Sequence, residues 1–327
     1  MVPRIALLIT TYNGEKVICD ALDSVLRQHR PPDELIIVDD GSADSTCERI
    51  EDWSRKTGYG LRLHRLDRNR YKRQFYGPAL PRRVGIGLAR ADVVAYLDQD
   101  DLVEPEHTAL LASGLEQNPD LVVCFGDMRV VDQTGTMHPS FLAMKEMLAG
   151  VACEEGTGGI RRFRHSAYGS LLAGSYIPTC AVLFRKSAVE AIGGVNPDLG
   201  GVDDWDLWLR LSRVGRFGYF QTVLGTRRVH NYNLSHNHFQ YVLTRHRVLK
   251  TASQNPHLLG LTMEELQATR AQLSAEMQAL LYHASREGIR TYWEVCREVR
   301  ETSSSRTVMT PRDLARALVF SPRRHVG

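Results

Sequence analysis

The sequence predicts an α/β fold with a helical C-terminal extension, on three observations. Two strand-like apolar runs, residues 4–9 and 34–38, flank a segment whose apolar positions recur at helical spacing, which is typical of a βαβ unit. Polar or acidic clusters follow the predicted strands, where open α/β sheets bind their ligands. Beyond Phe239 the apolar pattern becomes helical.

The other elements of the α/β part follow in chain order. Helical spacing predicts helices over 45–53 and 82–90, between apolar runs that are long enough only for strands. These runs and the later apolar stretches predict strands over 61–66, 93–97, 121–125 and 181–184. Residues 134–170 show no sustained period, so we expect an irregular insertion there, a loop or a lid that faces an acceptor.

Further helices are predicted later in the chain. Amphipathic spacing predicts helices over 203–211, 263–286 and 291–300. A last helix begins after Thr310, whose hydroxyl suits an N-cap, with Pro311 at the first helical position. We therefore expect an α/β domain over about 1–240 and a helical extension over 241–327.

The composition of the 327 residues is that of a globular protein. Hydrophobic residues make up 43% and charged residues 24%, which excludes wholesale disorder. The net charge of +3 suits anionic ligands but falls short of the basic stripe of a nucleic-acid-binding protein, so no nucleic-acid partner is expected. The six cysteines form no C-x-x-C pair, which argues against a zinc knuckle or a disulfide framework. No apolar stretch is long enough for a membrane span, so the predicted compartment is the cytoplasm.

The most informative cluster is Asp98-x-Asp100-Asp101, directly after the strand predicted over 93–97. Hard carboxylate oxygens at alternate positions can hold a divalent cation that also bridges a diphosphate, and such an ion would neutralise a departing nucleotide diphosphate. A solvated acidic turn that caps the next helix explains the cluster equally well when it is taken alone.

Two further clusters end predicted strands. Residues 39–42, D-D-G-S, offer carboxylates to the base or ribose of a nucleoside, although a plain turn between strand and helix is the commoner explanation when the cluster stands alone. Residues 10–13, T-T-Y-N, close the first strand with hydroxyls and an aromatic ring beside the expected base pocket. Since the strands are expected to be parallel neighbours, the three clusters should converge at one edge of the sheet.

Together these segments resemble the family 2 glycosyltransferases with the GT-A fold, over about residues 4–240. That family carries, in this order, a T-x-Y-N segment, a D-D-G-S turn, a G-x-x-x-A-R-N segment, an L-D-x-D-D metal motif and an E-D-W-D-L-W-x-R helix. The corresponding segments here are 10–13, 39–42, 77–83, 97–101 and 203–210. Two positions depart from the pattern: Arg83 stands where Asn is usual, and Asp203 where Glu is usual.

The resemblance implies a Rossmann-like mixed sheet flanked by helices, and transfer of a sugar from a nucleotide diphosphate donor with inversion. It also implies a donor half over about 1–125 and an acceptor half over about 126–240. Thr10, Tyr12, Asn13, Asp39 and Asp40 would bind the donor, mainly at its nucleoside, with Asp40 the better candidate for contacting the base. Arg82 would approach the donor's sugar or phosphates, and Asp98 its ribose or sugar. Asp100 is the expected direct ligand of Mn²⁺ or Mg²⁺.

An inverting transfer needs a base that removes the proton of the acceptor hydroxyl. The resemblance assigns this role to Asp204, with Asp203 beside it. The sequence adds a physical reason: Gly200 and Gly201 allow close backbone approach, and the apolar face of the helix that follows anchors the turn in the core. Because a helix N-terminus favours an ionised carboxylate, simple charge complementarity is the plainer alternative.

The remaining candidate is His230, in an R-x-H-x-x-N-x-S segment that resembles the part of GT-A enzymes completing the metal or diphosphate site. A zinc site of His230, His236 and His238 is the rival interpretation, but the spacing is irregular and no cysteine lies nearby in the sequence. A surface histidine on a loop is the plain alternative.

Two other functions fit parts of the sequence. A catalytically silent nucleotide-sugar-binding module would keep the fold, but the presence of Asp100, Asp204 and His230 argues against lost turnover. A sugar nucleotidyltransferase shares a related architecture but needs a glycine-rich basic loop after the first strand, where only Lys16 fits. The sequence therefore favours the transferase.

The expected partners follow from the resemblance. The donor is expected to carry UDP, the common nucleotide of the family. The acceptor is expected to be a saccharide or a lipid-linked saccharide of polysaccharide biosynthesis. The C-terminal arginines leave peripheral contact with an anionic membrane open, with an ordinary solvated helix as the alternative; they are Arg312, Arg316, Arg323 and Arg324. The sequence predicts no oligomeric state.

Overall fold

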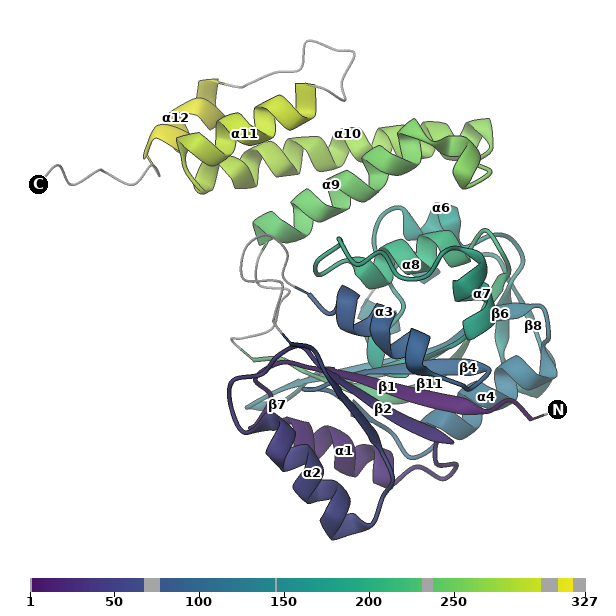
Figure 1. The fold of residues 1–327 in the computed structure, drawn as a ribbon. Coiled ribbons are helices and arrows are strands. Elements are labelled where there is room, and N and C mark those ends of the chain that lie inside the picture. The colour runs from purple at the N-terminus through teal and green to yellow at the C-terminus, as the bar shows by residue number, and fades with distance from the viewer. Residues whose placement is uncertain (1, 68–76, 145, 231–237, 301–310, 320–327) are drawn as a thin grey trace, which may run out of the picture. The chain divides into compact units, whose positions relative to one another are not determined.

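The computed structural model describes residues 2–67, 77–144, 146–230, 238–300 and 311–319, and Figure 1 shows their fold. They belong to two units, residues 1–233 and 234–327. The first unit carries a mixed sheet with helices on both faces, and the second consists of helices. This is the fold class that the sequence predicts.

The sheet of the first unit has a parallel half and a mixed half. The parallel half contains β1 (Ile5–Thr11), β2 (Glu34–Asp39), β3 (Arg62–Arg65) and β4 (Val93–Asp98). The mixed half contains β6 (Leu121–Asp132), β8 (Cys153–Glu155), β9 (Arg161–Phe163), β10 (Val182–Arg185) and β11 (Arg216–Arg228). The order is β3-β2-β1-β4-β10-β6-β11-β9-β8, with β5 (Leu102–Val103) on β11 and β7 (Gly135–His138) on β6. β10 runs antiparallel to both β4 and β6 and so joins the two halves.

Helices cover both faces of the parallel half, which explains why β1, β2 and β4 are apolar on both sides. One face carries α1 (Ile18–Leu26) and α2 (Thr46–Thr57), and the other carries α3 (Ala79–Leu88) and α8 (Asp203–Leu211) (Figure 1). Side chains alternate along β1: Ile5, Leu7 and Ile9 join one core with residues of α1, α2 and α4 (His107–Gln117). Leu8 instead lies against Gly85 of α3. Every residue of β1 is buried.

Three parts of the first unit differ from the prediction. The strand expected over 121–125 continues to Asp132. The region expected to be irregular contains β7, β8, β9, α5 (Phe141–Met144) and α6 (Tyr168–Leu171), each only three or four residues long and too short to show a period. The sequence reasoning assigned no strand to β11, although it has 13 residues. Gly218 and Gly225 interrupt its apolar pattern, because neighbouring segments of the same chain lie too close there to leave room for a side chain.

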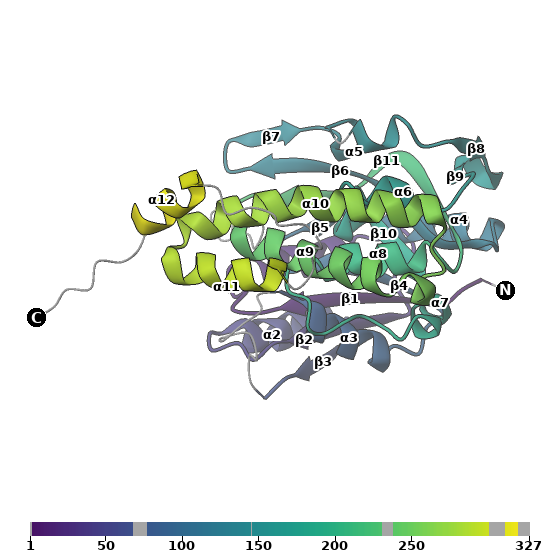
Figure 2. The same ribbon diagram turned by 90° about the horizontal axis from the view of Figure 1, so that it is seen from above.

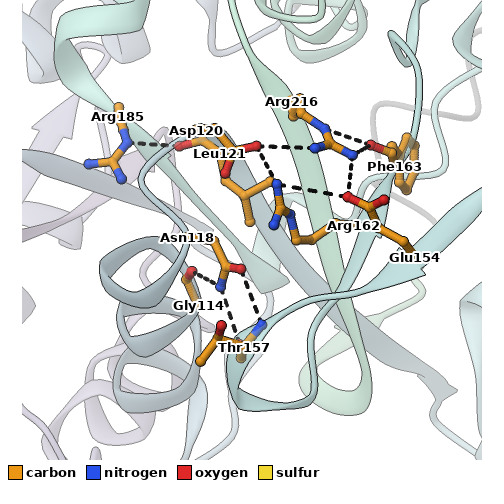
Figure 3. Close-up of polar contacts among 10 residues, drawn as sticks. All are labelled: Gly114, Asn118, Asp120, Leu121, Glu154, Thr157, Arg162, Phe163, Arg185 and Arg216. Carbon is orange, nitrogen blue, oxygen red and sulfur yellow. Dashed lines mark hydrogen bonds and ion pairs between the residues drawn. The ribbon is translucent and has the colours of Figure 1, made fainter.

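A network of polar contacts fixes the β8–β9 hairpin to the sheet, at the end where β6 and β11 begin (Figure 3). Arg216 donates from Nη2 to Glu154 and to the carbonyl of Phe163, each at 2.7 Å. Arg162 pairs with Asp120 at 2.5 Å. This part of the insertion is therefore anchored at the end of the sheet opposite the carboxyl ends of β6 and β11.

Short helices complete the first unit, and the described part of the second contains four α-helices and one short 3₁₀ helix. α7 (Lys186–Ala191) follows β10. The second unit contains α9 (His238–Gln254), α10 (Met263–Arg286), α11 (Ile289–Arg300) and α12 (Pro311–Val319), which Figure 2 shows from above. Its α10 begins with a capping box of Thr262 and Glu265, and Arg245 of α9 pairs with the buried Glu276 of α10 at 2.6 Å. The predicted cap Thr310 lies outside the described residues. No helix in the described part of the chain has both the length and the hydropathy to cross a membrane.

Candidate active site

The three polar clusters of the sequence meet at one edge of the sheet. β1 lies between β2 and β4 and is parallel to both. The register pairs Thr11 with Asp39 on one side and Thr10 with Asp98 on the other. The carboxyl ends of these strands therefore bring together the T-T-Y-N, D-D-G-S and D-x-D-D segments, as the sequence predicts.

The T-T-Y-N and D-D-G-S segments are fastened to each other. The backbone N–H of Asn13 donates to Ser42 Oγ at 2.8 Å, and Asn13 Oδ1 accepts from the N–H of Ala43 at 2.9 Å. Asn13 has φ = +47°, a left-handed conformation that asparagine tolerates better than most residues. Asn13 thus shapes this end of the sheet through its own backbone as well as its side chain.

The two aspartates of the D-D-G-S turn have different surroundings. Asp39 is fully buried and accepts from the N–H groups of Gly41 and Ser42 and from Ser42 Oγ, so its carboxylate holds the turn itself. Asp40 is also buried, but its Oδ1 has no hydrogen-bond partner among the described residues. Burial, with the adjacent charge of Asp39, raises the pKa of Asp40 to about 7. Asp40 is therefore the one of the two with an oxygen left for a ligand.

Gln99, the unspecified residue of the D-x-D-D cluster, joins that cluster to the end of β1. Its Oε1 accepts from Thr11 Oγ1 at 2.6 Å and from the N–H of Tyr12 at 2.9 Å, and its Nε2 donates to the Tyr12 carbonyl at 3.2 Å. The sequence reasoning missed Gln99. No signal in the sequence placed it beside Thr11, because that contact depends on the pairing of β1 with β4.

Arg82 of α3 is buried between two carboxylates. Its guanidinium lies 2.7 Å from Asp98 Oδ1 and 3.1 Å from Asp203 Oδ2, and it stands over the ring of Tyr96. Thr179 Oγ1 donates to the second oxygen of Asp98 at 3.0 Å. Arg82 thus connects the end of β4 to the start of α8. Its expected approach to the donor's sugar or phosphates stays a prediction.

Asp203 and Asp204 form the first turn of α8, which is anchored by the buried Trp205 and Trp208. Asp203 is buried and bound to Arg82, whereas Asp204 is partly exposed. Burial raises the pKa of Asp204 to about 6, and the charge of Asp203 adds to this effect while Arg82 opposes it. The expected preference of a helix N-terminus for the ionised form is therefore outweighed by burial. A carboxylate with this pKa is ionised at neutral pH and still basic enough to accept a proton.

The loop before Asp203 is packed closely against the start of α3. Gly77 has φ = +153°, and a Cβ on it would overlap the backbone nitrogen of Gly201. Arg83, the departure from the family pattern, donates to the carbonyl of Val195 at 2.7 Å and to that of Gly193 at 3.2 Å. Arg83 therefore has a structural role in supporting the segment that leads to α8.

The last candidates, Asp100 and His230, face each other. His230 Nε2 lies 2.8 Å from Asp100 Oδ2, so His230 follows β11 into the site rather than standing on the surface. Asp101 is buried and accepts from the N–H of Arg228 at 3.0 Å. Burial, together with the neighbouring acidic side chains, raises the pKa of both Asp100 and Asp101. Of the rival zinc set, His236 lies outside the described residues and His238 stacks on His283 of α10.

The donor set at Asp100 and His230 fits a divalent cation. A carboxylate oxygen and an imidazole nitrogen are ligands that Mn²⁺ accepts, and adjacent ligands of an octahedral ion stand about 3 Å apart, close to the separation found here. The described part of the chain holds no group of three or more His, Cys, Asp and Glu side chains arranged around a metal. A divalent cation of this kind is often bound through one or two side chains, and substrate phosphates and water complete its shell.

The chain matches a protein family model and is similar to several curated proteins. Residues 6–192 match the family model described as "Glycosyl transferase family 2". The chain is similar to the glucosyl-dolichyl phosphate glucuronosyltransferase of Haloferax volcanii, with 28% identity over 247 residues, 73% of this chain and 70% of that protein. It is also similar to the poly-beta-1,6-N-acetyl-D-glucosamine synthase of Staphylococcus epidermidis, with 28% identity over 61% of this chain and 43% of that protein. For the putative glycosyltransferase EpsH of Bacillus subtilis, identity is 31% over 37% of this chain and 33% of that protein.

Solved structures share the fold over nearly the whole chain. S. aureus TarS 1–349 in complex with UDP-GlcNAc has a TM-score of 0.57 at 16% identity, covering 94% of this chain and 95% of that one. The mannosyltransferase PcManGT from Pyrobaculum calidifontis, in complex with GDP-Man and Mn²⁺, has a TM-score of 0.61 at 17% identity, covering 93% and 77%. At these identities the likeness extends to the fold. Several of the curated relatives are longer, and the chain spans only 28% to 43% of the length of three of them.

Proposed function

Because the chain belongs to glycosyl transferase family 2 and is a glycosyltransferase, we propose that it transfers a sugar from a UDP-sugar to a hydroxyl of a saccharide or lipid-linked saccharide, with inversion. The observation that carries this proposal is the convergence, at one edge of the sheet, of an available buried carboxylate, a carboxylate–imidazole pair and a carboxylate with a pKa of about 6. Polysaccharide or glycoconjugate synthesis is the setting that the names of the relatives suggest.

The donor is proposed to lie across the carboxyl ends of β1, β2 and β4, in the half of the domain that covers about residues 1–125. Asp40 offers the free Oδ1 as an acceptor for an N–H group of the base. The partly exposed ring of Tyr12 and the side chains of Thr10, Asn13 and Asp39 border the nucleoside. Arg82 and Asp98 lie on the side where the donor's sugar and phosphates are proposed to bind.

Asp100 and His230 are proposed to hold Mn²⁺ or Mg²⁺ together with the diphosphate. A divalent cation bound there supplies positive charge that stabilises the leaving nucleotide diphosphate. The chain itself contributes the fixed geometry, since Asp100 is held between β4 and β11. A cation-dependent affinity for nucleotide diphosphates is the consequence that distinguishes this arrangement from a plain acidic turn.

Asp204 is proposed to accept the proton of the acceptor hydroxyl as its oxygen attacks the anomeric carbon and the bond to the diphosphate breaks. The acceptor is proposed to lie in the half that covers about residues 126–240. Asp203 supports this step from its ion pair with Arg82. The helical unit takes no part in these steps. Its proposed partners are an acceptor or an anionic membrane surface.

The direct test is a transfer assay on the purified chain. UDP-sugars and GDP-mannose are supplied with saccharide acceptors and Mn²⁺, and the product is identified by mass spectrometry and its anomeric configuration by NMR. A new glycosidic bond of configuration opposite to that of the donor is expected. Retention of configuration would contradict the role of Asp204, and pyrophosphate release from a sugar phosphate and a nucleoside triphosphate would favour a nucleotidyltransferase.

The pH dependence of transfer should report the general base. Because the pKa of Asp204 is raised to about 6, the reactive ionised form is lost as the pH falls through that value. At saturating donor, kcat is expected to fall about tenfold per pH unit below about pH 6 and to be level above it. Asp40 titrates near 7, but its effect belongs to donor binding and is removed by saturation. An Asp40→Asn variant should keep the same kcat profile, whereas a profile that stays level down to pH 4.5 would exclude a carboxylate base of this pKa.

A further inference from the structure

Arg228, the last residue of β11, contacts two segments that are far apart in the sequence. Its Nε donates to the carbonyl of Asp100, and its backbone N–H donates to Asp101 Oδ1 at 3.0 Å. Its Nη2 donates to the carbonyl of Val17, just before α1, at 3.3 Å, and its Nη1 pairs with Asp20 of α1 at 2.5 Å. One side chain therefore ties the D-x-D-D turn to α1, while its main chain ties the same turn to β11.

These contacts bear directly on the pair of Asp100 and His230. His230 follows Arg228 by two residues, so the end of β11 sets where its imidazole stands. The guanidinium of Arg228 holds the main chain of Asp100, so it sets where the opposing carboxylate stands. The 2.8 Å between Asp100 Oδ2 and His230 Nε2 therefore depends on one arginine that positions both partners.

The contacts of Arg228 contribute unequally to holding the turn in place. The ion pair with Asp20 is largely open to solvent, because 59% of the Asp20 side chain is exposed, and such pairs contribute little. The bonds to the two carbonyls are charge-assisted, and they use the planar fork of a guanidinium, which a single ammonium group does not reproduce. The important partners are therefore Asp100 and Val17.

We propose that Arg228 is a positioning residue for sugar transfer: it keeps the D-x-D-D turn and the His230 end of β11 together as one unit supported by α1. Arg228 itself touches neither donor nor acceptor in this account. Its effect on catalysis rests on the proposed function, but its effect on the order of the turn does not. The two effects are therefore measured separately.

Hydrogen–deuterium exchange followed by mass spectrometry tests the structural part on the full chain. In Arg228→Gln, peptides that cover residues 97–102 and 12–20 are expected to exchange about tenfold faster than in the wild type, with β1 and the helical unit unchanged. Two controls isolate the cause. Asp20→Asn removes only the exposed ion pair, and Arg129→Gln removes an arginine of neighbouring β6 that pairs with Glu104 at 3.3 Å. Both controls should match the wild type. Equal exchange in Arg228→Gln and the wild type, or equal acceleration in Asp20→Asn, would overturn the proposal.

Titration of transfer against Mn²⁺ tests the catalytic part. Arg228→Gln is expected to need about tenfold more Mn²⁺ for half-maximal rate, while the KM for the UDP-sugar at saturating Mn²⁺ stays within about twofold. A lower melting temperature with an unchanged Mn²⁺ requirement would reduce Arg228 to a structural role and overturn its catalytic assignment. A wild-type chain whose transfer ignores Mn²⁺ would instead refute the proposed metal site, and the exchange experiment alone would then decide the role of Arg228.

Discussion

Asp204→Asn is expected to lower kcat by a factor of about 10²–10⁴, the range that general base catalysis contributes. The amide keeps the shape and the hydrogen-bonding capacity of the side chain at the start of α8 but does not accept a proton at neutral pH. Removing one of two adjacent acidic groups also relieves their repulsion, so the fold should not suffer. The measurement is the initial rate of product formation at saturating donor and acceptor, with donor affinity measured calorimetrically in parallel.

The matched control for Asp204 is Asp206, two residues along the same helix. Asp206 pairs with Arg210 at 2.6 Å, and Arg210 also donates to the carbonyls of Ile192 and Gly194. Asp206→Asn should therefore lower the free energy of unfolding while kcat stays within a few-fold of the wild type. If both variants lose activity equally, or if Asp204→Asn retains strong transfer, Asp204 is not the base.

Arg82→Met is expected to be the most damaging single substitution for stability. It leaves the carboxylates of Asp98 and Asp203 without their common partner, and Asp203 is almost completely buried. Removal of one member of a buried ion pair costs about 3–5 kcal/mol, because the remaining charge stays desolvated. Urea unfolding followed by circular dichroism measures the loss.

Two companion variants separate the buried charges from the loss of an arginine in general. Arg83→Met removes the neighbouring arginine, which binds two carbonyl groups and no carboxylate among the described residues, and should cost clearly less. Arg82→Met combined with Asp203→Asn should recover part of the stability, because one unpaired charge is then removed. A double variant no more stable than Arg82→Met would show that the lost packing, rather than the unpaired carboxylate, is responsible.

The parallel half of the sheet could be predicted from the sequence because local pattern and burial agree there. β1, β2 and β4 are covered on both faces, so each appears as an unbroken apolar run that stops at a polar cluster. The sequence predicted that the three clusters converge, but the register that sets Thr10 opposite Asp98 is seen only in the structure. The pairing of His230 with Asp100, in contrast, was implied only by the resemblance to the family.

The elements and contacts that escaped prediction depend on partners distant in the sequence. β11 is interrupted by glycines at points where distant residues, such as Leu121 and Cys180, lie too close for a side chain, and this contact is invisible in a linear pattern. Gln99 occupies the variable position of its motif, and its importance lies in Thr11 and Tyr12, some 87 residues earlier. The raised pKa of Asp204 likewise follows from burial and from Asp203, which outweigh the helix terminus that local reasoning emphasises.

We propose that one site, built on Asp40, Asp100 and His230, binds a nucleotide diphosphate together with a divalent cation. Calorimetric titration of UDP and GDP into the wild type and Asp100→Asn, each with Mn²⁺ and with EDTA, tests it most directly. UDP is expected to bind the wild type at least about tenfold more tightly with Mn²⁺ than with EDTA, and Asp100→Asn is expected to lose this difference. Equal binding of UDP in Mn²⁺ and in EDTA, or an Mn²⁺ effect that survives in Asp100→Asn, would contradict it.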